Sequence, residues 1–186
     1  MSVKNKIREF FRYDLGLYRL TNFCYNVKWF FRNLKNFRKQ LWEFRSWDHS
    51  CAIDMYICCL EQLSKSIENG NEEDRSATKK VEKIHELIEL LKYSNEGLED
   101  ELFDLYDKLR KEGKTPNEIT AESYKFYHKF CKKIFTILEG QDRSVIYRKV
   151  DAILEEKYGG KEYPREEWYD EYVKLFDGSG ASGWWD

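Results

Sequence analysis

An unbroken 3-4 repeat of apolar residues constrains the fold of this chain more than any other feature of its sequence. The repeat covers residues 20–44 and consists of Leu20, Phe23, Val27, Phe30, Leu34, Phe37, Leu41 and Phe44. This spacing predicts a helix with one continuous apolar seam, and such a seam requires a partner helix along its length. The partner is either another helix of the same chain or the same helix of a second subunit.

The segment that carries this seam is also basic and rich in aromatic residues. Residues 1–47 hold eleven Lys and Arg against three carboxylates, which is a net charge of +8. Because the whole chain has a net charge of −2, residues 48–186 carry −10. Cations interleaved with aromatics are compatible with nucleic acid or with an anionic membrane surface. A strict heptad instead favours packing against a helix, and we predict a homo-oligomer, no nucleic acid polymer and no membrane. The aromatics that lie off the seam imply a second contact surface: Tyr25, Trp29, Phe31 and Trp42.

The rest of the chain reads as a succession of helices. Apolar residues recur at helical spacing over 53–67, 81–91, 98–109, 119–137, 145–158 and 168–175. The clearest boundary is Thr115-Pro116-Asn117-Glu118, where Thr115 caps a helix, Pro116 takes its first position and Glu118 closes a capping box. No segment alternates with period two long enough to predict a strand. We therefore predict an all-α fold, a helical bundle of about six to seven helices.

Three regions are predicted from composition and charge. Residues 1–47 form a basic aromatic helical segment for scaffolding or oligomerisation, and residues 48–177 form an acidic helical bundle. Residues 178–186 form a flexible glycine-rich linker with a Trp-Trp-Asp tail. No apolar run is long enough for a transmembrane helix, and no secretory signal is recognisable. The five cysteines show no disulfide spacing, which indicates reduced thiols in a cytosolic protein.

Catalytic motifs are incomplete throughout. The sequence His85-Glu86-Leu87-Ile88-Glu89 resembles a zinc-protease helix, but Glu89 replaces the second histidine. Glu82 and His85 form a Glu-x-x-His pair, yet no second copy exists for a di-iron site. A phosphate loop and a nucleophile elbow are also missing. We expect no enzyme, no catalytic residue, no metal and no cofactor.

The terminal Trp184-Trp185-Asp186 follows the glycine segment. Two adjacent indoles cannot both belong to the core of the preceding helix. They either dock into a groove of their own chain or act as an aromatic latch that closes on a ligand or a neighbouring subunit. The sequence leaves both readings open.

Two elements together resemble a group of small proteins of tailed bacteriophages. They are Arg-x-Trp-Asp-x-Ser over residues 45–50 and the terminal Trp-Trp-Asp, and the resemblance covers about residues 25–70 and the last three. The chain departs from the group in His49, where an aromatic is expected, and in the glycines before the tail. The resemblance implies a phage accessory protein in the host cytoplasm. Such proteins counter host defence by blocking an immune protein or by sequestering its nucleotide signal.

The function expected from the sequence is sequestration of a nucleotide-derived immune signal. Aromatic rings can stack on a base, arginine can hold phosphate, and carboxylates can accept from ribose hydroxyls. The residues predicted to bind the ligand are Arg45, Trp47, Asp48, Trp184, Trp185 and Asp186. The alternatives are an inhibitor or adaptor that binds a host defence protein, and a structural helical protein.

Overall fold

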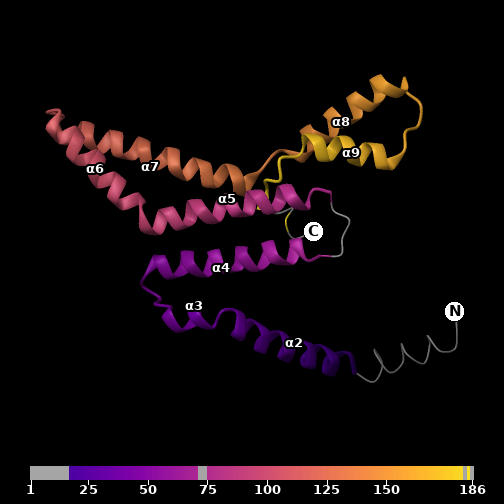
Figure 1. Cartoon of the computed structure of the whole chain (residues 1–186), viewed down its shortest axis with the longest axis horizontal. Coiled ribbons are helices and arrows are strands. Elements are labelled where there is room, and N and C mark those ends of the chain that lie inside the picture. Colours follow the sequence, from indigo (N-terminus) through magenta and orange to yellow (C-terminus); the bar gives the residue numbers. More distant parts are fainter. Residues whose placement is uncertain (1–16, 71–74, 182–183, 185–186) are drawn as a thin grey trace. The chain divides into compact units, whose positions relative to one another are not determined.

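The computed structural model describes residues 17–70, 75–181 and 184, and it is drawn in Figure 1. These residues form eight α-helices and no strand, which confirms the all-α prediction. The chain divides into two compact units, residues 1–55 and 56–186. This boundary lies eight residues beyond the predicted one at residue 47, because the first turns of α4 (His49–Glu68) group with the preceding helices.

The first unit contains the helices of the predicted seam. Helix α2 (Leu17–Asn36) and helix α3 (Arg38–Glu43) are separated at Phe37, whose φ of −103° and ψ of 11° leave the helical range. The i to i−4 hydrogen bonds nevertheless continue across this residue, from Phe37 N to Asn33 O at 2.9 Å and from Leu41 N to Phe37 O at 2.8 Å. The seam therefore bends at Phe37 but is not cut, and the split raises the helix count above the predicted one.

The second unit holds most of α4 and five further helices. Helices α5 (Ala77–Glu96), α6 (Leu98–Lys111) and α7 (Pro116–Glu139) pack on one another, and α8 (Arg143–Tyr158) pairs with α9 (Arg165–Leu175) as a hairpin (Figure 1). The predicted capping box is present: Glu118 N donates to the Thr115 hydroxyl, and Thr115 N donates to the Glu118 carboxylate. At the end of α8, Gly159 takes the left-handed conformation that stops the helix.

Apolar side chains of α4 to α9 form the core of the second unit. On α4 to α7 the buried residues include Leu60, Ile84, Leu87 and Ile119. In the α8–α9 hairpin the buried cluster consists of Ile146, Val150, Leu154 and Phe176. None of the described helices is long and apolar enough to cross a lipid bilayer.

The glycine segment after α9 is packed tightly against the second unit, whereas the sequence predicts a flexible linker there. Gly178, Ser179 and Gly180 are buried, and Gly180 N donates to the Ile137 carbonyl at 2.9 Å. The Lys79 ammonium, from the first turn of α5, donates to the carbonyls of Val173 and Phe176, each at 2.7 Å. The described part of the segment is thus a joint between α5, α7 and α9, because its glycines allow the backbones to approach closely.

Candidate functional site

Three of the predicted ligand-binding residues lie in the turn between α3 and α4. The Arg45 guanidinium donates to the carbonyls of Trp42 at 3.3 Å and Phe44 at 3.0 Å. The Asp48 carboxylate accepts from Ser50 N at 2.9 Å, which caps the first turn of α4. Trp47 is 82% exposed. Arg45 and Asp48 therefore have local structural roles, while the Trp47 indole is open to solvent.

The terminal tryptophans of the prediction are only partly described. Trp184 is 3% exposed, and its indole N–H donates to the Gly178 carbonyl at 2.7 Å. Its ring is docked on its own chain, which is one of the two readings that the sequence left open. Trp185 and Asp186 lie outside the described residues. Trp184 belongs to the second unit, and Arg45, Trp47 and Asp48 belong to the first.

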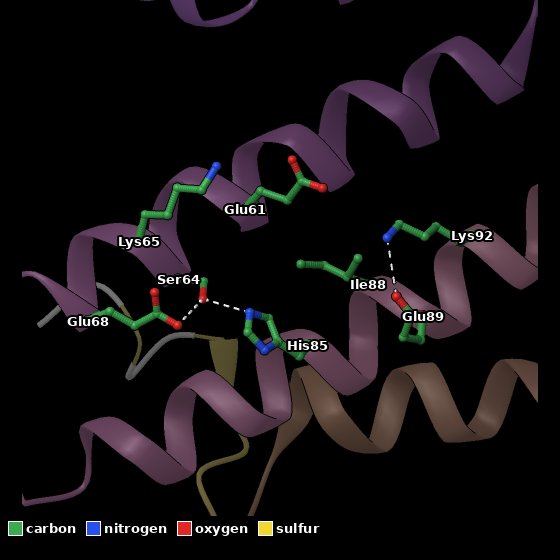
Figure 2. A pocket seen from close by; sticks show the side chains of 8 residues that line it. All are labelled: Glu61, Ser64, Lys65, Glu68, His85, Ile88, Glu89 and Lys92. Atoms are coloured by element: carbon green, nitrogen blue, oxygen red, sulfur yellow. Dashed lines mark hydrogen bonds and ion pairs between the residues drawn. The ribbon is translucent and has the colours of Figure 1, made fainter.

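A first pocket, of about 500 Å³, lies between α4 and α5 (Figure 2). At its base the Ser64 hydroxyl is 2.9 Å from His85 Nε2 and 3.5 Å from a Glu68 carboxylate oxygen. Charged side chains of both signs make up most of its lining: Glu61, Lys65, Glu68, Glu89 and Lys92. Such a lining has no dominant charge with which to select a ligand.

The Ser64–His85 contact has the distance of a nucleophile and its base, but its surroundings favour a structural role. Ser64 is 2% exposed and also contacts Glu68, so its hydroxyl already has two partners. No described carboxylate is hydrogen-bonded to the other nitrogen of His85. The contact joins α4 to α5 through a satisfied buried hydroxyl.

A second pocket, of about 600 Å³, is formed by the α8–α9 hairpin and the turn before α5. We call it the aromatic pocket, and its lining residues are Arg75, Tyr147, Arg165, Glu166, Trp168, Tyr169 and Tyr172. The rings of Trp168 and Tyr172 are parallel within 6°, with centroids 5.6 Å apart. Tyr147, from α8, meets Trp168 edge-on at 5.3 Å. Helical spacing on α9 places four of these side chains on one face, because residues 165, 168, 169 and 172 are three or four positions apart.

Hydrogen bonds from α8 hold the aromatic wall in place. The Asp151 carboxylate accepts from the Trp168 indole N–H at 2.8 Å and from the Tyr163 hydroxyl at 3.3 Å. The column of parallel rings continues from Tyr172 to the buried Phe176, with centroids 5.4 Å apart. The indole is thus fixed in one orientation and connected to the hairpin core.

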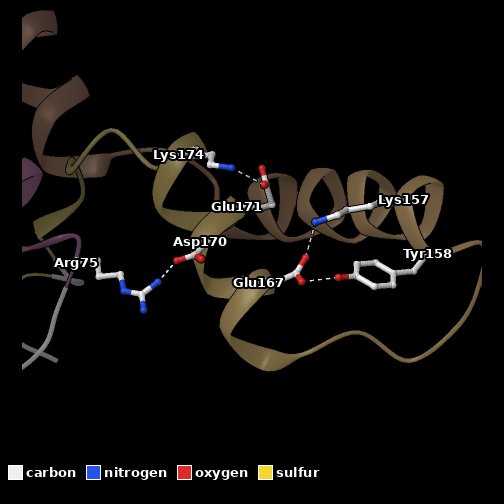
Figure 3. A network of polar contacts seen from close by, with 7 residues as sticks. All are labelled: Arg75, Lys157, Tyr158, Glu167, Asp170, Glu171 and Lys174. Atoms are coloured by element: carbon white, nitrogen blue, oxygen red, sulfur yellow. Dashed lines mark hydrogen bonds and ion pairs between the residues drawn. The ribbon is translucent and has the colours of Figure 1, made fainter.

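A network of polar contacts ties the opposite side of α9 to α8 (Figure 3). The Glu167 carboxylate accepts from the Lys157 ammonium at 2.5 Å and from the Tyr158 hydroxyl. Lys157, and then Tyr158, lower the pKa of Glu167, and the hydrogen bond to Glu167 raises the pKa of Tyr158. The contacts keep Glu167 ionised and fix the register of α9 against α8.

Charged side chains of both signs lie at the rim of the aromatic pocket. Arg75 forms an ion pair with Asp170, in which both side chains are about half exposed. Arg165 stands one turn from Trp168 on α9 and is exposed, and Glu166 lies beside it. The pocket therefore offers flat apolar faces, two guanidinium groups and one carboxylate. This set can bind a planar ring that carries an anionic group.

Trp168 and Tyr172 lie in the last helix predicted from the sequence, residues 168–175, but the pocket itself was not predicted. The cluster of aromatics at 168, 169 and 172 beside Arg165 was visible in the sequence. The contributions of Tyr147 and Arg75 were not, because only the tertiary fold brings them to α9.

Among the described residues, no three histidines, cysteines or carboxylates are grouped so that they could hold a metal ion. Comparison of the chain with protein-family models, with curated proteins and with solved structures gave no match.

Proposed function

We propose that this protein binds and sequesters a nucleotide-derived host immune signalling molecule, and that the ligand occupies the aromatic pocket. The observation that carries the proposal is the combination of an oriented aromatic wall with Arg75 and Arg165 at one opening of about 600 Å³. Ligand pockets for small molecules typically have volumes of about 300–1,000 Å³. The phage resemblance supplies the biological setting of the proposal.

Each chemical part of a nucleotide has a counterpart in the lining. A base can stack on the exposed part of Tyr147 or on the Trp168–Tyr172 wall. A phosphate can accept hydrogen bonds from the Arg165 guanidinium, whose fork of N–H groups fits phosphate oxygens. The Glu166 carboxylate can accept from a ribose hydroxyl. We expect binding without turnover, because serine, cysteine and histidine do not occur among the described residues that line the pocket.

The test is a thermal-shift screen of the purified chain against cyclic dinucleotides and cyclic ADP-ribose isomers. A specific ligand raises the melting temperature by mass action. Chromatography of the recovered compound distinguishes sequestration, in which the ligand is intact, from catalysis, in which it is altered. If no compound raises the melting temperature, the nucleotide proposal is wrong.

Variants localise the binding to the pocket. Arg165→Gln should weaken the affinity at least about tenfold, because a hydrogen bond to a charged group contributes about 1.5–3 kcal/mol. Tyr147→Leu retains apolar packing but removes a stacking face, and it should weaken binding about 5- to 100-fold. Arg148→Gln is the matched control, since Arg148 is an exposed arginine of α8 outside the pocket lining. Equal affinities of Arg165→Gln and the control would place the ligand elsewhere.

The pocket also supports a second candidate, an inhibitor or adaptor that binds a host defence protein. Trp, Tyr and Arg dominate the residues that contribute most to protein–protein affinity, and here they are clustered on one face. This candidate predicts a stable complex with a host protein that Tyr147→Leu weakens, and no thermal shift with any nucleotide.

A further inference from the structure

Most described residues of the apolar seam on α2 and α3 are exposed to solvent, and Phe37 is partly buried. Phe23 is 65% exposed and Phe30 is 61% exposed, and Leu34, Leu41 and Phe44 are also exposed. Helix α3 contains no buried residue. Water-exposed phenylalanines in a row are costly, since each offers on the order of 150–250 Å² of apolar surface.

Aromatic residues on the opposite face of α2 contact partners on their own helix, as Phe30 of the seam does with Phe31, whose ring centroid is 5.5 Å away. Tyr25 meets Trp29 edge-on, with ring centroids 5.9 Å apart. The Arg32 guanidinium lies over the Trp29 ring, 4.7 Å from its centroid. The face with Tyr25, Trp29 and Arg32 is therefore partly satisfied locally.

Most cations of α2 and α3 are placed away from the seam. In the heptad that the seam defines, the flanking positions within these helices are Arg19, Cys24, Asn26, Phe31, Asn33, Arg38 and Gln40. Arg19 and Arg38 are the charged residues of this set, while Lys28, Arg32, Lys35 and Lys39 occupy the outer positions. Flanking residues face each other when two such helices pair. A copy of this basic helix can consequently approach another with little charge repulsion.

The seam is also large enough for a specific interface. Four phenylalanines recur every seven residues, at 23, 30, 37 and 44, with Val27, Leu34 and Leu41 between them. Two copies that cover the exposed parts of these side chains would bury on the order of 1,000 Å². This area reaches the range of specific protein–protein interfaces.

We infer that the α2–α3 seam binds the same seam of a second copy of this chain. The heptad spacing, the exposed phenylalanines, the mostly uncharged flanks and the available area all favour this occupant. The inference concerns the first unit and is independent of the nucleotide proposal, which concerns the aromatic pocket.

Sedimentation velocity of the full chain over a range of concentrations tests the inference. The unaltered chain should sediment as a dimer at micromolar concentrations. Phe30→Asp places a carboxylate in the seam and should raise the dimer dissociation constant at least about tenfold. Tyr25→Asp is the matched control: Tyr25 is 58% exposed on the same helix, so this variant loses a similarly exposed aromatic and gains the same charge outside the seam. It should remain a dimer.

Phe23→Asp, at another seam position, provides an independent second variant, and circular dichroism confirms that each variant retains its helix content. A monomeric unaltered chain would overturn the inference. Equal dissociation of Phe30→Asp and Tyr25→Asp would also overturn it, because the contact would then not depend on the seam.

Discussion

Gly178 has a backbone conformation and a close neighbour that together allow only glycine. Its φ of +87° lies in the range that residues with a side chain rarely adopt, and a Cβ at this position would overlap the Lys79 carbonyl. Composition alone suggests flexibility for a Gly-Ser-Gly segment, but close backbone packing requires the same residues. This ambiguity explains why the sequence predicts a linker where the structure has a joint.

Gly178→Ala should destabilise the protein strongly, and Gly113→Ala is its matched control. Gly113 also has a positive φ, +78°, but nothing lies within 4 Å of a Cβ placed there. The control should lose about 1–2 kcal/mol through backbone strain alone. Gly178→Ala should lose about 2 kcal/mol more, because the new methyl group has no space. Urea unfolding of both variants measures the difference, and equal losses would show that the joint is loose in solution.

Trp184 should act as a structural residue. Trp184→Ala removes a side chain that is 3% exposed, and it should cost about 3–5 kcal/mol. Trp184→Phe keeps most of the apolar volume but loses the hydrogen bond to the Gly178 carbonyl, so its loss should be smaller by about half or more. Urea unfolding provides the free energies. A loss below about 0.5 kcal/mol for Trp184→Ala, typical of a surface position, would restore the latch reading.

At the scale of the helices, local sequence signals predicted the elements well because they act within one turn. Thr115, Pro116 and Glu118 produce the predicted start of α7, and Asp48 caps α4 by accepting from Ser50 N. No sequence feature predicted the kink at Phe37, since the heptad continues through this residue without a proline or glycine. The aromatic pocket likewise had only a partial signal, on α9. Its other walls come from Tyr147 and Arg75, which no local pattern connects to that helix.

The capping box predicts how acid affects α7. Hydrogen bonds from the Thr115 backbone N–H, and then from its hydroxyl, lower the pKa of Glu118. A carboxyl group whose pKa is lower in the folded state stabilises that state at any pH above its unfolded value, near 4.3. This contribution is lost as the pH falls through the folded pKa. The unfolding free energy of Glu118→Gln should therefore decline less between pH 5 and pH 3 than that of the unaltered chain.

The measurement is urea unfolding at several pH values, with Glu122→Gln as the control. Glu122 is an exposed glutamate of the same helix, outside the capping box. Identical pH profiles for Glu118→Gln and the unaltered chain would show that the box does not contribute in solution.

At the scale of the whole molecule, the two units differ in what the sequence could establish about them. The seam and the charge asymmetry of the first unit are periodic features, and the sequence carries them in full. The joint of the second unit depends on residues about one hundred positions apart. No local sequence pattern indicates that these residues contact each other. The all-α class, the apolar seam and capped helix starts such as that of α7 were therefore predictable. The joint, the docked Trp184 and the pocket beside α9 required the tertiary structure.

The joint at Lys79 has a consequence for the order of events during protein synthesis. Lys79 is translated 94 and 97 residues before the carbonyls of Val173 and Phe176 that its ammonium contacts. At about 5–20 residues per second, a ribosome needs about 5–20 s to cover this distance. During that interval the first turn of α5 lacks the hydrogen bonds from Lys79 to the Val173 and Phe176 carbonyls, and it lacks its contact with Gly178. Helices α5 to α7 can form as they emerge, but the second unit closes only after α9 has left the ribosome.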